Sequence, residues 1–247
     1  MPQSENQDAP GAGSPPPAAG KPRDAATLII VDTTLPVPRM LMGRRRPDLV
    51  FMPGKFVFPG GRVDTADKDM VSADELDAGE IQKLLAEMKG HPSAARARSL
   101  ALAAVREAYE ETGIIVGSAA SGIAAPEHAC WQSFAARSYL PRIAPLAFFA
   151  RAITPPGRPR RFDTRFFCLP ADAIAEDTGV VDDELSEIGW YTSDDTRGMD
   201  LPPITRVVIE DLADRLRSGP LGPAPVPVPF YHQRHGTFLR DMIEPQT

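Results

Sequence analysis

The feature that most constrains how this chain folds is a run of acids inside an apolar helix pattern, AAVREAYEETGII at residues 103–115. On a helical wheel of about 100° per residue, Glu110 and Glu111 fall within about 60° of Glu107, so three carboxylates share one face. The opposite face carries the side chains that must point to a core, Leu102, Val105 and Tyr109. The segment therefore predicts a helix with one buried side and one strongly acidic side.

These acids conflict with the local energetics of a helix, and the conflict suggests a ligand. Gly113 ends the apolar pattern, so the acids sit in the last turn, where the helix dipole disfavours anions. Each pair of like charges at this spacing costs a further ~0.2–0.5 kcal/mol. A bound divalent cation would reverse both penalties, whereas the competing interpretation is a solvated acidic face. Arg106, one turn before Glu110, and a glycine-rich turn upstream favour the cation.

The upstream turn lies in KFVFPGGRVD, residues 55–64. We expect the short strand FVF to run into a Gly60–Gly61 turn, whose missing side chains allow the backbone to approach a phosphate closely. Asp64 and Asp67 follow, and each is interpreted either as an outer contact of the site or as an ordinary turn acid. The turn and the acidic helix together predict one anion-handling, metal-dependent site.

The rest of the chain is an irregular alternation of strands and helices, which indicates an α/β fold with a mixed sheet. Strands are expected at residues 28–31, 38–46, 56–58, 113–117, 145–153, 165–170 and 187–191. Helices are expected at 71–89, 93–112 and 204–217, with a short helix or loop at 130–136. A polyproline-like stretch at 219–229 and a closing hairpin at 230–242 complete the pattern.

Two competing signals mark the start of the helix expected at 71–89. Ser72 with Glu75 and Asp77 with Glu80 both have the spacing of a capping box. The helix has one apolar stripe, formed by Ile81, Leu84, Leu85 and Met88. This stripe must cover either the surface of its own domain or the same stripe on a second subunit, which leaves a homodimer open.

Length and composition suggest one domain with decorated ends. The chain has 247 residues, 43% of them hydrophobic, which is enough for one sizeable core. We place a disordered tail at 1–22, because its Pro, Gly, Ala and Ser content builds no core. The domain itself is expected at 23–219, followed by a Pro-rich segment and C-terminal hairpin at 220–247.

Charge and cysteine content restrict the partners and the compartment. A net charge of −6 and a pI near 5.3 argue against nucleic acid or an anionic membrane as a partner. No apolar run approaches the roughly 18 residues of a membrane span, and the N-terminus lacks the apolar segment of a secretory signal. Cys130 and Cys168 are interpreted as free thiols, which predicts a cytoplasmic location. His232 and His235 are interpreted as exposed hairpin side chains.

With these residues in view, the chain resembles the Nudix hydrolases. Their box reads Gly, five residues, Glu, seven residues, then Arg-Glu-U-x-Glu-Glu-x-Gly-U, where U is aliphatic; residues 106–114 match its second half, with Ala108 as a small U. Gly61 followed by five residues leads to Asp67, an acid where the family usually has Glu. From Asp67 to Arg106 there are 39 positions, which is 31 more than in the family pattern. A long insert here is similar to a branch that includes peroxisomal coenzyme A diphosphatases of eukaryotes.

The resemblance implies a Nudix-type α/β/α sandwich with a mixed sheet and a helical insertion at about 68–98 within the box. It also implies a hydrolase that cleaves the diphosphate bond of a nucleoside diphosphate linked to another moiety, by attack of water on phosphorus. Mg²⁺ or Mn²⁺ suits carboxylate ligands, and the family positions of the ligands are Glu107, Glu110 and Glu111. Arg106 would orient these glutamates, and Gly60–Gly61 would shape the loop beside the substrate.

The general base and the substrate are left open among alternatives. Glu187, Glu184 and Asp183 are candidate bases, and Arg44 in the Arg44–Arg46 cluster either grips substrate phosphates or solvates a strand end. Coenzyme A or an acyl-CoA competes with a dinucleotide as substrate, because Val50 stands where coenzyme A-type members carry Arg. We expect the insertion to form a helical flap that controls substrate choice. The alternative to an enzyme is a catalytically inactive Nudix-like module that binds a nucleotide and regulates a partner.

Overall fold

The computed structural model describes residues 20–179, 182–219 and 221–245, so the predicted tail at 1–22 lies almost entirely outside the described residues. Its central feature is a nine-stranded sheet in the order β11-β2-β1-β9-β8-β12-β13, with β3 beside β2 and β4 beside β1. These strands are β1 Arg23–Asp32, β2 Arg39–Arg45, β3 Phe56–Val57, β4 Gly60–Arg62, β8 Ala147–Ile153, β9 Phe162–Pro170, β11 Leu185–Thr192, β12 Val228–Arg234 and β13 Thr237–Ile243. Two small sheets pair β5 Ile114–Ile115 with β10 Glu176–Asp177 and β6 Gly117–Ala119 with β7 Tyr139–Pro141.

The sheet is mixed, as predicted. Strand β1 runs parallel to β9 over nine paired residues, and β12 runs parallel to β8. The other pairings in the large sheet are antiparallel, which includes β1 with β2 and β8 with β9. The C-terminal hairpin expected at 230–242 is therefore not a separate appendage. Its first strand joins β8 and extends the same sheet.

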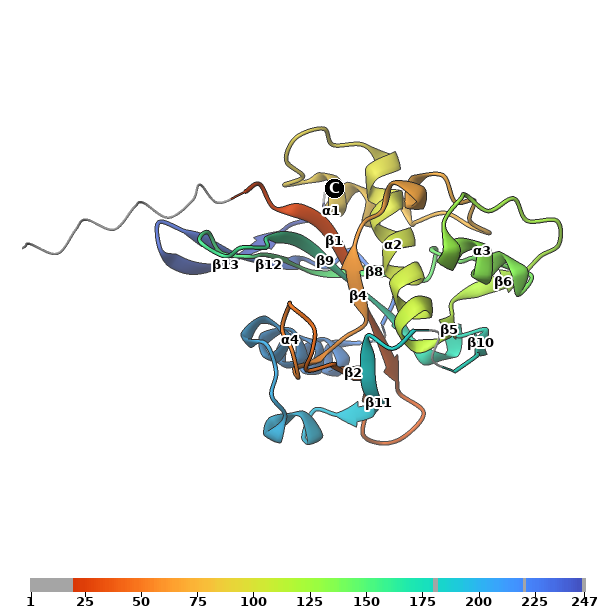
Figure 1. Cartoon of the computed structure of the whole chain (residues 1–247). Coiled ribbons are helices and arrows are strands. Elements are labelled where there is room, and N and C mark those ends of the chain that lie inside the picture. Colours follow the sequence, from red (N-terminus) through yellow and green to blue (C-terminus); the bar gives the residue numbers. More distant parts are fainter. Residues whose placement is uncertain (1–19, 180–181, 220, 246–247) are drawn as a thin grey trace, which may run out of the picture.

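Helices cover both faces of the sheet (Figure 1). Helix α2, Ala94–Thr112, and helix α1, Ala78–Leu85, share one buried cluster with the sheet, and α3, Ala129–Ala136, packs beside α2. Helix α4, Pro203–Ser218, packs on the other face in a second cluster. Three short 3-10 turns complete the structure: Thr65–Lys68, Ala171–Ala173 and Asp195–Gly198. The result is the three-layer α/β/α arrangement expected from the sequence.

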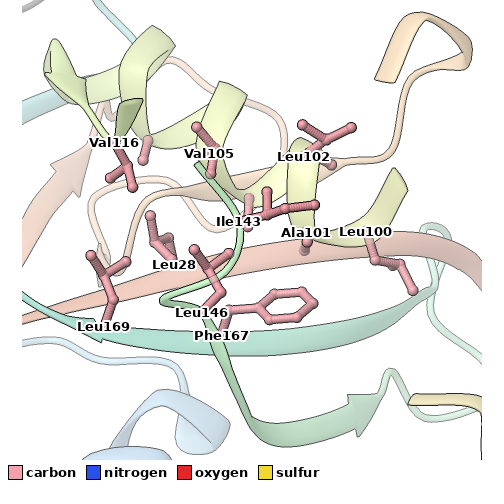
Figure 2. Close-up of a cluster of buried hydrophobic side chains, with 14 of the residues drawn as sticks. Leu28, Leu100, Ala101, Leu102, Val105, Val116, Ile143, Leu146, Phe167 and Leu169 are labelled. Atoms are coloured by element: carbon pink, nitrogen blue, oxygen red, sulfur yellow. The ribbon is translucent and has the colours of Figure 1, made fainter. Parts of the chain in front are cut away.

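The larger core cluster lies between α2 and the central strands. Figure 2 shows Leu28 of β1 and Phe167 and Leu169 of β9 on the side of the sheet toward which the helix residues Leu100 and Ala101 point. All five side chains are fully buried. Burying one such side chain is worth about 1.5–3 kcal/mol, so this contact holds α2 firmly against the sheet. The acidic face of α2 is consequently fixed relative to the strands on which it lies.

Both ends of α2 agree with the sequence prediction. The Ser93 hydroxyl accepts a hydrogen bond from the Arg96 backbone N–H, which caps the first turn. At the other end, Gly113 has φ 76° and donates its N–H to the Tyr109 carbonyl. A Cβ atom at Gly113 would lie only 1.6 Å from the Gly179 carbonyl oxygen. This position therefore requires glycine both for its left-handed backbone and for the space that a side chain would occupy.

The insertion differs from its prediction in two respects. Its helix covers only Ala78–Leu85, and Asp77 caps it by accepting hydrogen bonds from the N–H groups of Gly79 and Glu80. Glu80 does not complete a capping box, because its buried carboxylate pairs with Lys83 at 2.7 Å and accepts the Phe148 N–H at 2.7 Å. The helix therefore begins at Asp77, one of the two predicted starts, while the Glu80 carboxylate joins it to Phe148 of β8.

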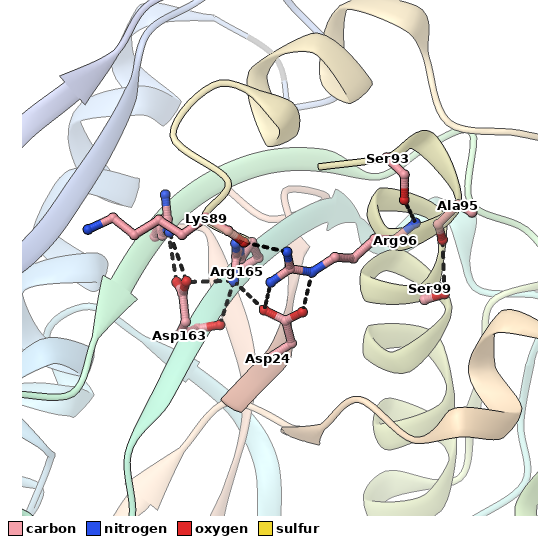
Figure 3. Close-up of polar contacts among 9 residues, drawn as sticks. Asp24, Lys89, Ser93, Ala95, Arg96, Ser99, Asp163 and Arg165 are labelled. Carbon is pink, nitrogen blue, oxygen red and sulfur yellow. Dashed lines mark hydrogen bonds and ion pairs between the residues drawn. The ribbon is translucent and has the colours of Figure 1, made fainter. Parts of the chain in front are cut away.

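The insertion is also not a flap outside the sheet. Met70, Leu76, Leu84 and Met88 are buried in the same cluster as α2. Figure 3 shows the end of the insertion tied down further, because Arg96 donates to the Lys89 carbonyl at 2.7 Å. The insertion is therefore an integral part of the core. Within the described residues, no helix combines the length and apolar character that crossing a membrane requires.

Candidate active site

Strand β4 brings two glycine residues against the acidic end of α2. The Gly60 N–H donates to Glu111 Oε2 at 2.8 Å. A Cβ atom at Gly61 would lie 2.6 Å from the Glu107 carboxylate, and one at Gly60 would lie 2.6 Å from the Ala26 carbonyl oxygen. The predicted Gly-Gly turn is thus a short strand beside β1, and its glycines allow two carboxylates to approach the backbone.

Arg106 occupies the centre of the acidic cluster and is almost fully buried. Its Nη1 atom lies 2.9 Å from Glu107 Oε1 and 3.0 Å from Glu110 Oε2, while Nη2 donates to the Arg62 carbonyl at 2.9 Å. Burial alone disfavours the charge, but hydrogen bonds to Asp67 and the neighbouring glutamates raise the pKa of Arg106. The guanidinium therefore remains charged and orients two of the three glutamates.

Asp67 is the residue that anchors Arg106. It is fully buried and accepts from Arg106 Nε at 2.7 Å and Nη2 at 3.1 Å. Its oxygens also accept from Trp131 Nε1 at 2.9 Å and from the Asp64 N–H at 2.8 Å. Asp67 and Arg106 are 39 positions apart in the sequence, yet they form one bidentate pair. The structure thus brings the two separated halves of the sequence motif together.

The three glutamates have different environments. Glu111 has a side chain only 2% exposed, and the cation nearest to it is Arg45, whose Nη1 lies 4.0 Å from Oε1. Burial, with the charge of Glu107 adding to it, raises the pKa of Glu111 well above its ordinary value. Burial also raises the pKa of Glu107 to about 7, with the charge of Glu110 contributing in the same direction and Arg106 opposing. Glu110 is half-exposed and paired with Arg106.

The donor set of this cluster fits a hard divalent cation. Carboxylate oxygens are the ligands that Mg²⁺ and Mn²⁺ prefer. Burial, with a smaller contribution from neighbouring acids, raises the pKa of both Glu107 and Glu111. Within residues 20–179, 182–219 and 221–245, no group of three His, Cys, Asp or Glu side chains has the spacing of a metal cage. Two of the glutamates face Arg106 instead, and the third faces Gly60.

The loop before β11 brings further acids to this end of α2. The Asp182 N–H donates to the Glu110 carbonyl at 3.0 Å. Glu184 pairs with Arg45 Nη2 at 2.6 Å, so Arg45 lies between Glu184 and Glu111. Burial raises the pKa of Asp182, with the charge of Glu110 contributing. Of the candidate bases, Glu184 is therefore the one joined to the glutamate cluster.

Glu187 and Arg44 lie elsewhere than expected. Glu187 sits in an irregular part of β11 with φ 49°, its side chain is 54% exposed, and its Oε1 pairs with Arg44 Nη1 at 2.9 Å. The two residues contact each other and not the three glutamates. Within the predicted Arg44–Arg46 cluster, it is Arg45, with a mostly buried side chain, that reaches the glutamates, and not the chosen Arg44. In a run of three arginines only strand alternation distinguishes their faces, and the sequence alone did not fix which one pointed inward.

Comparison with known proteins supports the fold. No protein-family model matches this chain, and no curated protein sequence matches it. A NUDIX hydrolase from Alicyclobacillus acidocaldarius is similar in structure, with a TM-score of 0.59 and 23% identity over 82% of this chain and 99% of that chain. A MutT NUDIX hydrolase from Burkholderia pseudomallei matches 78% of this chain and 99% of its own, with 19% identity and a TM-score of 0.43. On the first of these likenesses, the chain has the Nudix hydrolase fold, as predicted.

Proposed function

We propose that this chain is a Nudix hydrolase that cleaves the diphosphate bond of a nucleoside diphosphate linked to another moiety. The observation that carries the proposal is the geometry at the end of α2. Two of the three glutamates, Glu107 and Glu110, pair with a buried Arg106 that Asp67 holds from across the fold. Gly60 and Gly61 lie directly against the carboxylates of Glu111 and Glu107. A purely structural role would not require an acidic cluster with so few cations beside it.

We assign Glu107, Glu110 and Glu111 as the residues that would hold Mg²⁺ or Mn²⁺. When bound, such an ion supplies charge neutralisation for the diphosphate and a water of lowered pKa. Arg106 keeps Glu107 and Glu110 on the same side of α2, and the Gly60 N–H fixes Glu111. The chain's own contribution is therefore to present three oriented carboxylates beside a backbone that leaves space for phosphate oxygens.

We place the proton acceptor at Glu184 in preference to Glu187, and Arg44 and Gly60–Gly61 remain proposed substrate contacts. Glu184 adjoins the cluster through Arg45, whereas Glu187 contacts Arg44. The expected result is a larger loss of kcat in Glu184→Gln than in Glu187→Gln, with melting temperatures unchanged. Equal rates for wild type and Glu184→Gln would remove Glu184 from the mechanism.

The substrate class is coenzyme A, an acyl-CoA or a dinucleotide, and a panel of these compounds tests the whole proposal. Product release is measured with Mg²⁺, Mn²⁺ or chelator for wild type, Glu110→Gln and Glu111→Gln. Cleavage should require metal and fall by about 100-fold or more in both variants, because the ion supplies several kcal/mol to the transition state. Wild-type turnover in both variants at saturating Mg²⁺ contradicts the assignment of the ligands.

A nucleotide-binding regulatory module is the other outcome of the same panel. The structure gives it one supporting observation, since the described carboxylates do not form a ready cage for a metal. Tight binding of a nucleotide without cleavage at any metal concentration would favour this module over an enzyme. We also propose a cytoplasmic location, because Cys130 and Cys168 are both free and buried.

A further inference from the structure

Strand β13 is the outermost strand at one end of the nine-stranded sheet, and Figure 1 shows its hairpin on the side of the molecule away from α3. Within the described part of the chain, β13 pairs only with β12, in an unbroken one-to-one register. Its sequence TFLRDMI contains no Pro, no Lys and no bulge, which are usual devices that prevent an edge strand from pairing. Its two charged residues, Arg240 and Asp241, each contact a partner within the chain's own fold. This edge is therefore competent to accept another strand.

The turn of the hairpin determines which backbone groups of β13 face outward. His235 and Gly236 have φ values of 50° and 80°, as a two-residue type I′ turn requires. In such a turn the two flanking residues, here Arg234 and Thr237, are joined by backbone hydrogen bonds. The N–H and C=O groups of Thr237 therefore point toward β12. Because the direction alternates along an antiparallel strand, positions 238, 240 and 242 point their N–H and C=O groups away from β12.

Pro229 confirms this alternation independently. It opposes Met242, one of the outward positions, so its missing N–H removes no hydrogen bond between β12 and β13. At an inward position, a proline would have broken the ladder. The outward edge of β13 thus presents the unpaired backbone N–H and C=O groups of positions 238, 240 and 242.

The side chains on this edge are apolar or already neutralised. Phe238 is 57% exposed and Met242 is 41% exposed. Met242 lines a cavity together with residues of α4, and strand alternation places Phe238 on the same face, where its ring stacks on Tyr231 at 6.0 Å between ring centres. Between them, Arg240 donates to Asp211 at 3.1 Å and lies 5.9 Å from the Tyr231 ring centre. The charge that would otherwise repel a second strand is therefore occupied within the chain's own fold.

We propose that two copies of this chain associate through β13, paired antiparallel about a two-fold axis at Arg240. In this register the outward backbone groups of position 240 meet those of position 240 in the second copy, and those of 238 meet those of 242. In a continuous sheet, paired residues must have their side chains on the same face. Positions 238, 240 and 242 satisfy this condition, because all three have their side chains on one face of β13. Each Phe238 then lies opposite a Met242, a favourable pairing of sulfur with an aromatic ring.

A cavity beside Met242 fits this arrangement. It has a volume of about 150 Å³, and its walls combine apolar side chains, among them Met242, with charged ones, among them Asp211 and Arg215. In the proposed register, Phe238 of the second copy lies beside the apolar wall at Met242. One strand pair is a small interface, so the association is expected to be weak and dependent on concentration.

Sedimentation equilibrium over a wide concentration range tests the proposal. Wild type is expected to form dimers in the micromolar range. Phe238→Lys introduces two charges into the symmetric interface and is expected to raise the dissociation constant by at least about tenfold. Leu35→Lys is the matched control, since Leu35 is an exposed apolar residue in the turn between β1 and β2, and its dissociation constant should equal that of wild type.

A second pair of variants separates backbone pairing from side-chain contact. Arg240→Ala keeps the outward N–H and should still dimerise, whereas Arg240→Pro removes it and should be monomeric with an unchanged far-UV spectrum. If Arg240→Pro does not fold, the dissociation constants of Phe238→Lys and Leu35→Lys decide whether β13 forms the interface. A wild type that is monomeric at every concentration, or dimers that Phe238→Lys leaves unchanged, would overturn the proposal.

Discussion

Helix α2 begins beside one buried charge cluster and ends in another, and the two clusters differ in their balance of charge. At its start, Arg96 and Arg165 share Asp24, and Arg165 and Arg151 share Asp163 (Figure 3). At its end, Arg106 pairs with Asp67, Glu107 and Glu110, while the third glutamate, Glu111, has Arg45 only at 4.0 Å. The first cluster has three arginines for its two acids, and we call it the balanced cluster because each acid is paired with arginine. The second cluster, which we call the unbalanced cluster, has more acids than arginines. Only this cluster would therefore be stabilised by an additional cation.

The difference teaches how to distinguish a structural charge network from a ligand site. In the balanced cluster the arginines also reach backbone carbonyls, because Arg151 donates to Glu87 and Arg96 donates to Lys89. These bonds hold the end of the insertion onto β8 and the first turn of α2. Burial is common to both clusters, and so it does not discriminate between them. The discriminating property is whether the protein itself supplies the opposite charges.

The largest expected effect comes from breaking the balanced cluster. Asp163 accepts from both Nε and Nη2 of Arg151 at 2.8 Å. Asp163→Asn leaves buried guanidinium groups without their counter-charge and should lower the free energy of unfolding by about 3–5 kcal/mol. Urea denaturation measures this loss. Asp194→Asn, in an exposed pair with Arg197, is the control and should leave unfolding unchanged. A small loss in Asp163→Asn would mean that the cluster is not structural.

The next effect comes from adding a cation to the unbalanced cluster. Mn²⁺ or Mg²⁺ at 100 times its dissociation constant should stabilise wild type by about 2.7 kcal/mol, because the ion binds only the folded chain. Glu111→Gln should lose most of this stabilisation, whereas Asp163→Asn, if folded, should retain it. Thermal unfolding with metal and with chelator gives the comparison. Equal metal-induced shifts in wild type and Glu111→Gln would place the ion elsewhere.

The same contrast explains what the sequence predicted and what it did not. The ends of α2 were predictable because Ser93 and Gly113 act locally, through a cap and a left-handed turn. The three glutamates were predictable for the same reason, since helical spacing alone places them on one face. The Nudix-type layers followed from the alternation of elements and from the resemblance that these residues carry.

The remaining features depend on partners far away in the sequence. Glu80 has the spacing of a capping residue, yet it is buried against Lys83 and the backbone of Phe148 and Ala224. Asp67 was open between a turn acid and an outer contact until its pairing with Arg106 was seen. Arg45, and not Arg44, faces the glutamates because the register of β2 against β11 sets the face. Apart from the pair of Glu80 with Lys83, three residues apart on one helix, each of these contacts joins separate elements of the chain.

A smaller effect concerns pH and the balanced cluster. Although burial opposes it, hydrogen bonds and charges from Arg96 and Arg165 lower the pKa of Asp24 below its ordinary 3.8. A lowered pKa stabilises the fold above pH 3.8, and this contribution is lost as the pH falls through the folded-state value. Asp24→Asn should therefore cost about 1.5 kcal/mol at pH 7, the lower end for hydrogen bonds to charged groups. The cost should shrink in strongly acidic buffer; an equal cost at both pH values contradicts the pairing.

The smallest effect distinguishes two neighbouring glutamates within the unbalanced cluster. Among the described residues, Glu111 is buried with the Gly60 N–H as its one close donor, whereas Glu110 is 33% exposed and paired with Arg106. In chelator, Glu111→Gln removes a like charge from the face and should raise the free energy of unfolding by about 0.2–0.5 kcal/mol. Glu110→Gln loses an ion pair of similar worth, so its stability should not change. Replicate denaturant titrations resolve a difference of this size. A loss of stability in Glu111→Gln would show that Arg45, despite its 4.0 Å separation, already compensates this carboxylate without metal.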